Sequence, residues 1–391
     1  MLTTQFGLFA AGNGLSLIGT WMQKIACAWL IWNWTQSSLL LGVLAAGDLM
    51  PVIVVGPFAG VAADRWNRMH QNIVAQMMST ALALVVALLL WIDQLNIVTL
   101  IACVTLQGTL MAAVQPARLA MVQQMVARED MTVAVAINSI NVNMARMVGP
   151  AIAGVMITQL DIIWVFVANA VVTSAFVVLL LRLKLKPREE EPSRGKFLAL
   201  MLEGFVYVGQ RPQIRMLLVV LFLGGVCLRS LLELVPAIAA QTFQDATIGL
   251  AVLTGTAGFG AMISGLTVRN GETAPLLREV LVWWGTGAMA GAVLTNAPHV
   301  VLALPAAAFV GAAITRGLVG TQTFIQLSTP DALRGRVLSV HGLIARASPA
   351  VGALGIGYFA DRIGLPAAVS VASVLLLVVV LGLWLRERTG G

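Results

Sequence analysis

Charged side chains are scarce in this sequence. Asp, Glu, Lys and Arg make up 10% of its 391 residues, against roughly 25% in an average soluble domain. Apolar residues reach 59%, which is more than a water-soluble globule of this length can bury. The composition therefore excludes a soluble enzyme and indicates a membrane protein with many spans, whose main partner is the lipid bilayer.

Cysteine and histidine are also rare, with three of each. Cys27, Cys103 and Cys227 lie far apart inside apolar segments, as small packing residues do. The spacing needed for a zinc site does not occur, and the sequence has no Gly-x-x-x-x-Gly-Lys loop to hold ATP. We therefore expect no metal, no cofactor and no enzymatic activity.

The net charge of +7 does not indicate a nucleic-acid partner. Basic residues are spread over short loops instead of forming one patch, which is typical of residues that set membrane topology. We therefore expect no binding to nucleic acid.

Runs of about 20 apolar residues, the length of one membrane span, predict twelve helices. The predicted ranges are 6–32, 39–59, 71–92, 98–115, 133–157, 162–181, 214–240, 248–267, 276–294, 300–325, 337–359 and 366–385. One long polar linker divides them into two sets of six. The sequence therefore predicts an all-α membrane protein with bundles at 1–186 and 214–391, joined by a linker at 187–213 that includes an amphipathic helix.

Loop charges orient this arrangement. If the amino terminus is cytoplasmic, all loops on the outer side together hold one basic residue, Arg362, and the other basic loop residues are cytoplasmic. Such an asymmetry is the positive-inside pattern. We therefore expect a multi-pass protein of the cell membrane with both termini in the cytoplasm.

Three motifs resemble those of a known transporter family. The loop Gly60-x-x-x-Asp64-Arg65-x-x-Arg68 is similar to the signature between helices two and three of major facilitator superfamily transporters. The segment 145–150, which ends in Gly149 and Pro150, resembles the antiporter signature of helix five, and the segment 330–337 precedes helix eleven. The segments 145–150 and 330–337 also resemble the branch of the superfamily that contains the enterobactin exporter and macrolide and drug efflux proteins.

This resemblance implies the major facilitator fold, in which two six-helix bundles rock about a site near the middle of the membrane. It also implies an exporter in a bacterial inner membrane. The resemblance also implies which residues control conformational gating. They are Gly60, Asp64, Arg65 and Arg68 of the loop motif, Gly149 and Pro150 of helix five, and Arg334 and Arg336 before helix eleven.

One departure limits what the resemblance implies. Drug–proton antiporters of better-known branches carry Arg-x-x-Gln-Gly in helix four, but here Val104 precedes Gln107-Gly108. The proton machinery of those branches therefore does not transfer to this sequence.

Ionisable residues at membrane depth are costly and often functional. The sequence places Lys24, Asp48, Arg146, Arg229, Glu233, Arg316, His341 and Arg346 there. Cations outnumber carboxylates, so we expect an anionic small-molecule substrate bound by guanidinium and ammonium groups. The candidate substrate-binding residues are Lys24, Gln107, Arg146, Arg229, Arg316 and Arg346. The alternative is that the arginines bond backbone carbonyls and Lys24 reaches the interface, which leaves a near-neutral cavity suited to amphiphilic drugs.

The coupling ion is expected to be a proton, carried by Asp48 or Glu233. Arg229 lies one predicted helical turn before Glu233, so these two residues can form a structural ion pair. Asp48 is therefore the favoured coupling residue, with a purely packing role as its alternative.

These observations predict a secondary active transporter that works as a monomer and exports an organic anion such as a siderophore. The alternative is a multidrug efflux pump for neutral or cationic amphiphiles. A membrane enzyme is disfavoured because no metal or nucleophile constellation is present. A channel is disfavoured by the two sets of six helices.

Overall fold

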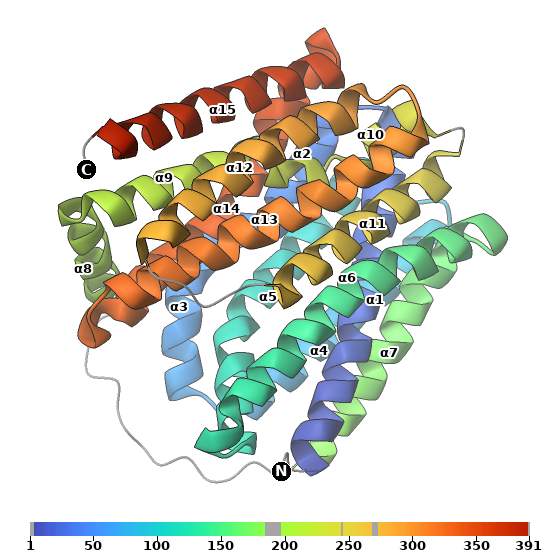
Figure 1. Cartoon of the computed structure of the whole chain (residues 1–391). Coiled ribbons are helices and arrows are strands. Elements are labelled where there is room, and N and C mark those ends of the chain that lie inside the picture. The colour runs from blue at the N-terminus through green and yellow to red at the C-terminus, as the bar shows by residue number, and fades with distance from the viewer. Residues whose placement is uncertain (1–3, 184–196, 244, 268–272, 390–391) are drawn as a thin grey trace. The chain divides into compact units, whose positions relative to one another are not determined.

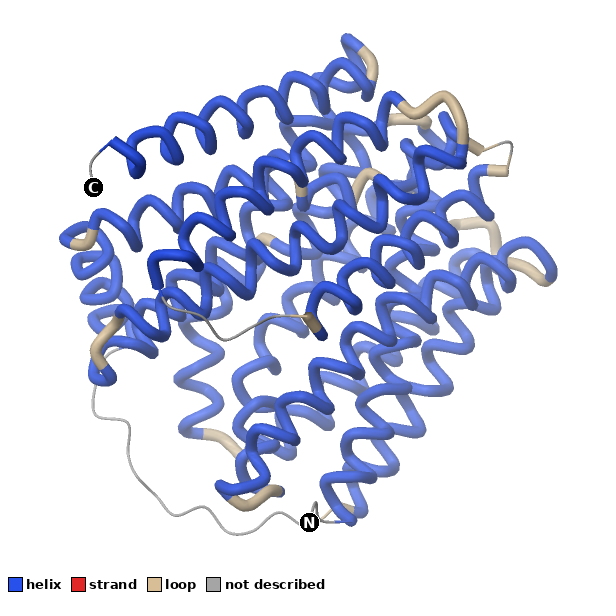
Figure 2. Tube along the Cα trace, viewed as in Figure 1, coloured by secondary structure: helices blue, strands red, loops and turns tan. Residues whose placement is uncertain are grey.

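The computed structural model describes residues 4–183, 197–243, 245–267 and 273–389 (Figure 1). All regular structure in these residues is helical, and Figure 2 shows helices joined by short loops. Ten helical segments in the described residues are long and apolar enough to cross a membrane. The predicted all-α membrane architecture is therefore confirmed.

The first half of the chain forms helices α1 to α7. Their bounds are α1 Thr4–Thr35, α2 Ser38–Leu49, α3 Pro51–Arg65, α4 Arg68–Trp91, α5 Ile97–Met125, η1 Arg128–Asp130, α6 Met131–Gln159 and α7 Ile162–Arg182. The second half begins with the short helix α8 Phe197–Gln210, which occupies the predicted amphipathic segment. It continues with α9 Pro212–Cys227, η2 Arg229–Leu232, α10 Val235–Thr242, α11 Ala246–Leu266, α12 Thr273–Asn296, α13 Val300–Ser328, α14 Asp331–Ile363 and α15 Leu365–Thr389.

Two predicted helices are interrupted, which corrects the prediction of continuous spans. The helix predicted at 39–59 breaks at Met50, between α2 and α3, and Pro51 begins the new helix. The helix predicted at 214–240 breaks after Cys227, and Pro236 lies in the first turn of α10. Proline has no N–H and its ring clashes with the preceding turn, so it is best placed where a helix begins.

Most helices also extend beyond their predicted ends. Asn67, Asn96 and Asp245 accept hydrogen bonds from the first-turn amides of α4, α5 and α11. Such caps accept hydrogen bonds from the first backbone N–H groups of a helix, which have no partner within the helix and none among apolar side chains. Counting apolar residues finds the membrane core of a helix but misses these polar first turns.

The chain forms two compact units, whose relative placement is not described. Unit 1 contains residues 1–30 and 50–195, and unit 2 contains residues 31–49 and 196–391. Helix α2 therefore groups with the second half of the chain, while α3 groups with the first. The bundle boundaries predicted from the sequence remain a prediction.

The core of unit 1 is built on aromatic and methionine side chains. Phe9 on α1 packs against Phe176 on α7, with ring centroids 5.8 Å apart. Met121 on α5 is fully buried in the same cluster. Helix α4 packs along α5 and α7, as Figure 1 shows. Long apolar faces thus join helices that are distant in sequence.

Unit 2 is packed around Trp284 on α12, which is fully buried. Gly224 on α9 and Gly317 on α13 lie against its ring, so closely that a Cβ atom at either position would lie under 3.0 Å from the indole. Small residues allow helices to approach closely where no water drives their association. Trp284 therefore fixes the positions of three helices.

Candidate functional site

Two of the predicted substrate-binding cations of unit 1 flank one indole ring. The guanidinium carbon of Arg146 on α6 lies 5.2 Å from the ring centroid of Trp21 on α1. The Nζ atom of Lys24 lies 5.5 Å from the same ring. Both distances suit cation–π attraction, which is stronger where water is scarce. The cluster of Trp21, Lys24 and Arg146 thus gathers aromatic surface and positive charge on two helices.

Gly149 brings the two helices of this cluster together. A Cβ atom at Gly149 would lie 2.7 Å from Cβ of Trp21, so a larger residue would push α6 away from α1. Pro150 follows inside α6 without ending the helix. The gating role predicted for Gly149 and Pro150 remains a prediction, but Gly149 has a packing reason to be glycine.

Amide side chains in unit 1 divide into two kinds. Asn169 on α7 donates to Oε1 of Gln23 on α1 at 2.5 Å, and Asn141 donates to the backbone oxygen of Ala10 at 2.7 Å. These amides join helices. In contrast, Oε1 of Gln107 is buried and accepts no hydrogen bond from the described residues. Gln107 therefore offers a buried acceptor, and its role in binding substrate remains a prediction.

Two predicted cations of unit 2, Arg229 and Arg346, lie near the interruption of the seventh span. Arg229, the first residue of η2, donates from Nη1 to the backbone oxygen of Ala345 on α14. The next residue on α14 is Arg346, which is exposed. Gly352 lies against the backbone of Val226, so α9 and α14 are closely packed here. The guanidinium of Arg229, at the break between α9 and η2, thus stabilises a backbone carbonyl of α14.

Arg316 joins three helices of unit 2. Its Nη1 donates to Oε1 of Glu279 on α12 at 2.7 Å, and its Nη2 donates to the backbone oxygen of Thr267 at 2.8 Å. The guanidinium also lies 5.5 Å from the ring of Trp283. Its substrate role remains a prediction, but a carboxylate of the same unit already offsets its charge.

The two carboxylates proposed for proton coupling lie next to helix interruptions. Asp48 is half-buried near the end of α2, two residues before the break at Met50. Glu233 follows η2, and its amide donates to the backbone oxygen of Ser230 at 3.0 Å. Because η2 is a 3₁₀-helix, the α-helical spacing assumed between Arg229 and Glu233 does not hold.

The predicted gating residues fall on separate elements. Arg65 is exposed at the end of α3, and Arg68 donates from Nε to the backbone oxygen of Ala63 at 3.2 Å. Arg334 pairs with Asp331 at 2.5 Å, and Arg336 pairs with Glu203 on α8. Gly60 is half-buried within α3, and the side chain of Asp64 lies outside the described part of the structure.

Sequence reasoning missed two residues that organise polar contacts. Trp21 lies three residues before Lys24, and this spacing places both side chains on one face of a helix. The sequence could therefore have predicted that Trp21 lies near Lys24. Asp361 accepts hydrogen bonds from Oγ of Ser37 and from the amides of Ser38 and Leu39, at 2.6 to 3.2 Å. Because Asp361 lies 324 residues from Ser37, no local sequence pattern shows that it caps α2.

Several known proteins are similar to this chain over most of its length. The family model described as transmembrane secretion effector matches residues 3–388. The multidrug efflux pump Tap of Mycolicibacterium fortuitum is 27% identical over 94% of this chain and 91% of its own. Macrolide efflux protein A of Streptococcus pyogenes is 24% identical over 90% of this chain and 89% of its own.

Another relative matches over a shorter stretch. The staphyloferrin A transporter of Staphylococcus aureus is 26% identical, and the alignment covers 50% of this chain and 50% of that protein. Two solved structures show the same fold. The nucleoside transporter NupG superposes with a TM-score of 0.76 over 97% of this chain and 98% of its own, at 12% identity. A bacterial homologue of the human lysosomal transporter Spinster also superposes with a TM-score of 0.76. The superposition covers 98% of this chain and 96% of its own, at 14% identity.

These matches identify a multi-pass membrane transporter of small molecules and exclude the rival interpretation as an enzyme. The predicted major facilitator fold is thereby confirmed, because both structural neighbours are transporters that align over nearly their whole length. The chain belongs to the transmembrane secretion effector family of major facilitator superfamily transporters.

Proposed function

We propose that this protein exports an organic anion by alternating access, as a monomer driven by protons. The observation that carries the proposal is the cluster of Trp21, Lys24 and Arg146. Its indole face suits a flat or aromatic group, and its cations suit carboxylate, catecholate or phosphate oxygens. The staphyloferrin A transporter, one of the relatives, is named for a siderophore. In this proposal the amino terminus and carboxyl terminus are cytoplasmic and the membrane is a bacterial inner membrane.

The second candidate is efflux of neutral or cationic amphiphiles. It is favoured by the relatives that align over most of their length, which are named as multidrug and macrolide efflux proteins. The engaged charges of Arg316 and Arg229 also fit it, because a guanidinium bound to a carboxylate or a carbonyl attracts an anion less. Substrate charge separates the two candidates.

Arg146→Gln should reduce export of an anion far more than export of a neutral analogue. Loss of one charge-assisted hydrogen bond costs about 1.5–3 kcal/mol, or roughly tenfold to a hundredfold in affinity. We would measure uptake into inside-out proteoliposomes, using a catecholate siderophore and its uncharged methylated analogue. The neutral analogue should change by less than about twofold.

Trp21→Phe and Trp21→Leu serve as matched controls for the ring. Phenylalanine keeps an aromatic face and should retain most anion export, whereas leucine should not. Equal losses for charged and neutral compounds in Arg146→Gln would contradict the anion proposal. Preferential export of cations by the unaltered protein would support the multidrug alternative instead.

Proton coupling is expected to depend on Asp48 or Glu233. Asp48→Asn should abolish accumulation driven by a pH gradient, because an amide cannot load and release a proton. It should leave solute counterflow, which needs no net proton movement, within about twofold of normal. Glu233→Gln is the matched comparison. If both variants still concentrate substrate against its gradient, the coupling residue lies elsewhere.

A further inference from the structure

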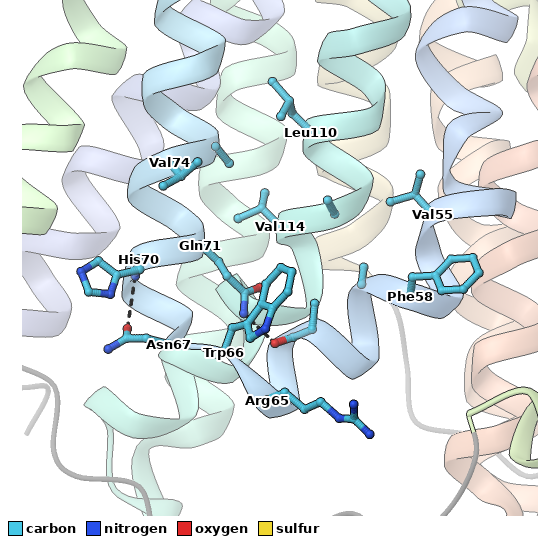
Figure 3. Close-up of a pocket in the computed structure, with 14 residues that line it drawn as sticks. Val55, Phe58, Arg65, Trp66, Asn67, His70, Gln71, Val74, Leu110 and Val114 are labelled. Carbon is cyan, nitrogen blue, oxygen red and sulfur yellow. Dashed lines mark hydrogen bonds between the residues drawn. The ribbon is translucent and has the colours of Figure 1, made fainter.

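A large groove opens on unit 1 between α3 and α4, and α5 forms its floor. Its volume is about 980 Å³. Helix α5 packs against both α3 and α4. Figure 3 shows side chains from these three helices around the groove. All of the lining residues belong to unit 1.

The groove is polar at one end and apolar along the rest of its length. Arg65 and Trp66 lie where α3 ends, and His70 lies in the first turn of α4 and points to the other side of the turn from Arg65, as Figure 3 shows. Above them the walls are Val55, Phe58, Val74, Leu110 and Val114. This arrangement matches a molecule with a polar head and a long apolar tail.

The apolar wall is open to its surroundings. Phe58 is 67% exposed and Val74 is 53% exposed, although both lie on membrane helices. Trp66 is 68% exposed at the turn between α3 and α4, where an amphipathic ring favours the headgroup level of a bilayer. In a membrane, such a surface faces acyl chains and not water.

The polar end carries positive charge. Arg65 is exposed there and contributes a guanidinium, which can bind phosphate oxygens by two parallel hydrogen bonds. Arg68 follows in the same turn, and exposed His70 adds an imidazole. The described lining has no acidic side chain, and in the sequence of this turn Arg65 and Arg68 outnumber the one carboxylate, Asp64. The charge therefore favours a headgroup with net negative charge.

We propose that this groove binds one anionic phospholipid. Its phosphate lies at Arg65, Trp66 lies beside the glycerol, and one acyl chain lies along α5 between Phe58 and Val74. The charge asymmetry of the loops places this end of the groove in the cytoplasmic leaflet, where anionic lipids attract basic residues. The proposal needs only that the end lies at a membrane surface.

Trp66 provides a local probe of occupancy. The protein would be placed in nanodiscs of phosphatidylcholine with increasing amounts of phosphatidylglycerol brominated near the headgroup. Subtracting the emission of Trp66→Phe isolates Trp66 from the other nine tryptophans. We expect quenching of Trp66 to saturate at a low fraction of phosphatidylglycerol, and brominated phosphatidylcholine to quench it only in proportion to its abundance.

Two substitutions test the two ends of the site. Arg65→Ala should raise the phosphatidylglycerol fraction at half-quenching about fivefold, the effect of one basic residue near an anionic surface. Arg215→Ala removes an exposed arginine that lines a different groove, on α9 of unit 2, and should leave Trp66 quenching unchanged. Ala113→Phe should fill the floor of the groove and prevent saturation.

Ala102→Phe is the matched control for the filled groove, because Ala102 lies exposed on α5 and outside the lining. Equal quenching by the two brominated lipids would overturn the proposal. So would unchanged half-quenching in Arg65→Ala, or equal effects of Ala113→Phe and Ala102→Phe. These readouts measure binding alone, so they do not depend on the transported substrate.

Discussion

Gly260→Ala should strongly destabilise the protein, although it adds only one methyl group. Gly260 on α11 lies against the backbone of Ala308 on α13, and Gly311 on α13 lies against the backbone of Ala257 on α11. A Cβ atom at either glycine would lie under 3.0 Å from a carbonyl group. Backbone cannot rotate aside as a flexible side chain can, so the two helices must separate.

The contact also carries a hydrogen bond that separation would break. Oγ of Ser264 donates to the backbone oxygen of Ala312 at 3.0 Å. Overpacking costs about 1–3 kcal/mol, and sometimes more, while a whole domain is stable by about 5–15 kcal/mol. We therefore expect a loss of about 3 kcal/mol or more, visible as a lower melting temperature and less monodisperse protein in size-exclusion chromatography.

Gly355→Ala is the matched control. Gly355 lies within α14 and is exposed, and a Cβ atom there would have no neighbour within 4 Å. This variant should fold as well as the unaltered chain. A Gly260→Ala protein with an unchanged melting temperature would contradict the close packing of α11 and α13.

The sequence predicted the helices well because the membrane imposes their length and composition. A backbone in lipid must satisfy its own hydrogen bonds, so apolar runs of about 20 residues have few alternatives to a helix. The interruptions at Met50 and after Cys227 were not predicted. Proline is tolerated inside membrane helices, as Pro116 within α5 shows, so Pro51 alone does not reveal a break.

The site was harder to predict because its contacts join distant residues. Arg316 and its partner Glu279 are 37 residues apart, and Ser37 and Asp361 are 324 apart. Composition identifies a costly buried charge but cannot say which side chain meets it. The sequence-based count of deep charges did not include Glu279, whose carboxylate pairs with Arg316. Trp21 lies beside Arg146 because α1 and α6 approach closely at Gly149. The sequence does not reveal this approach.

Asp361→Ala should release the start of α2 from the end of α14. Both segments belong to unit 2, and their backbones meet closely where Gly357 lies against Ser38. Oδ1 of Asp361 accepts from the amide of Ser38 at 2.7 Å, and Oδ2 accepts from Oγ of Ser37 at 2.6 Å. One carboxylate of α14 thus caps the first turn of another helix.

The expected effect follows from the number and charge of these bonds. A helix cap contributes about 0.5–2 kcal/mol, and a negative charge at a helix amino end adds to it. Exposure of Asp361 to solvent weakens this contribution, so we expect a loss of about 1.4 kcal/mol. That value corresponds to about a tenfold increase in the open population of the first turn.

Hydrogen exchange of the peptide that contains residues 37–49 measures this opening directly. Asp361→Ala should speed exchange of the first amides of this peptide about tenfold. Asp361→Asn keeps an acceptor and should speed this exchange less. Asp245→Ala removes the cap of α11, whose bonds to Thr247 and Ile248 are local, and should speed exchange there alone. Unchanged exchange in residues 37–49 of Asp361→Ala would show that packing between Gly357 and Ser38 holds α2 without its cap.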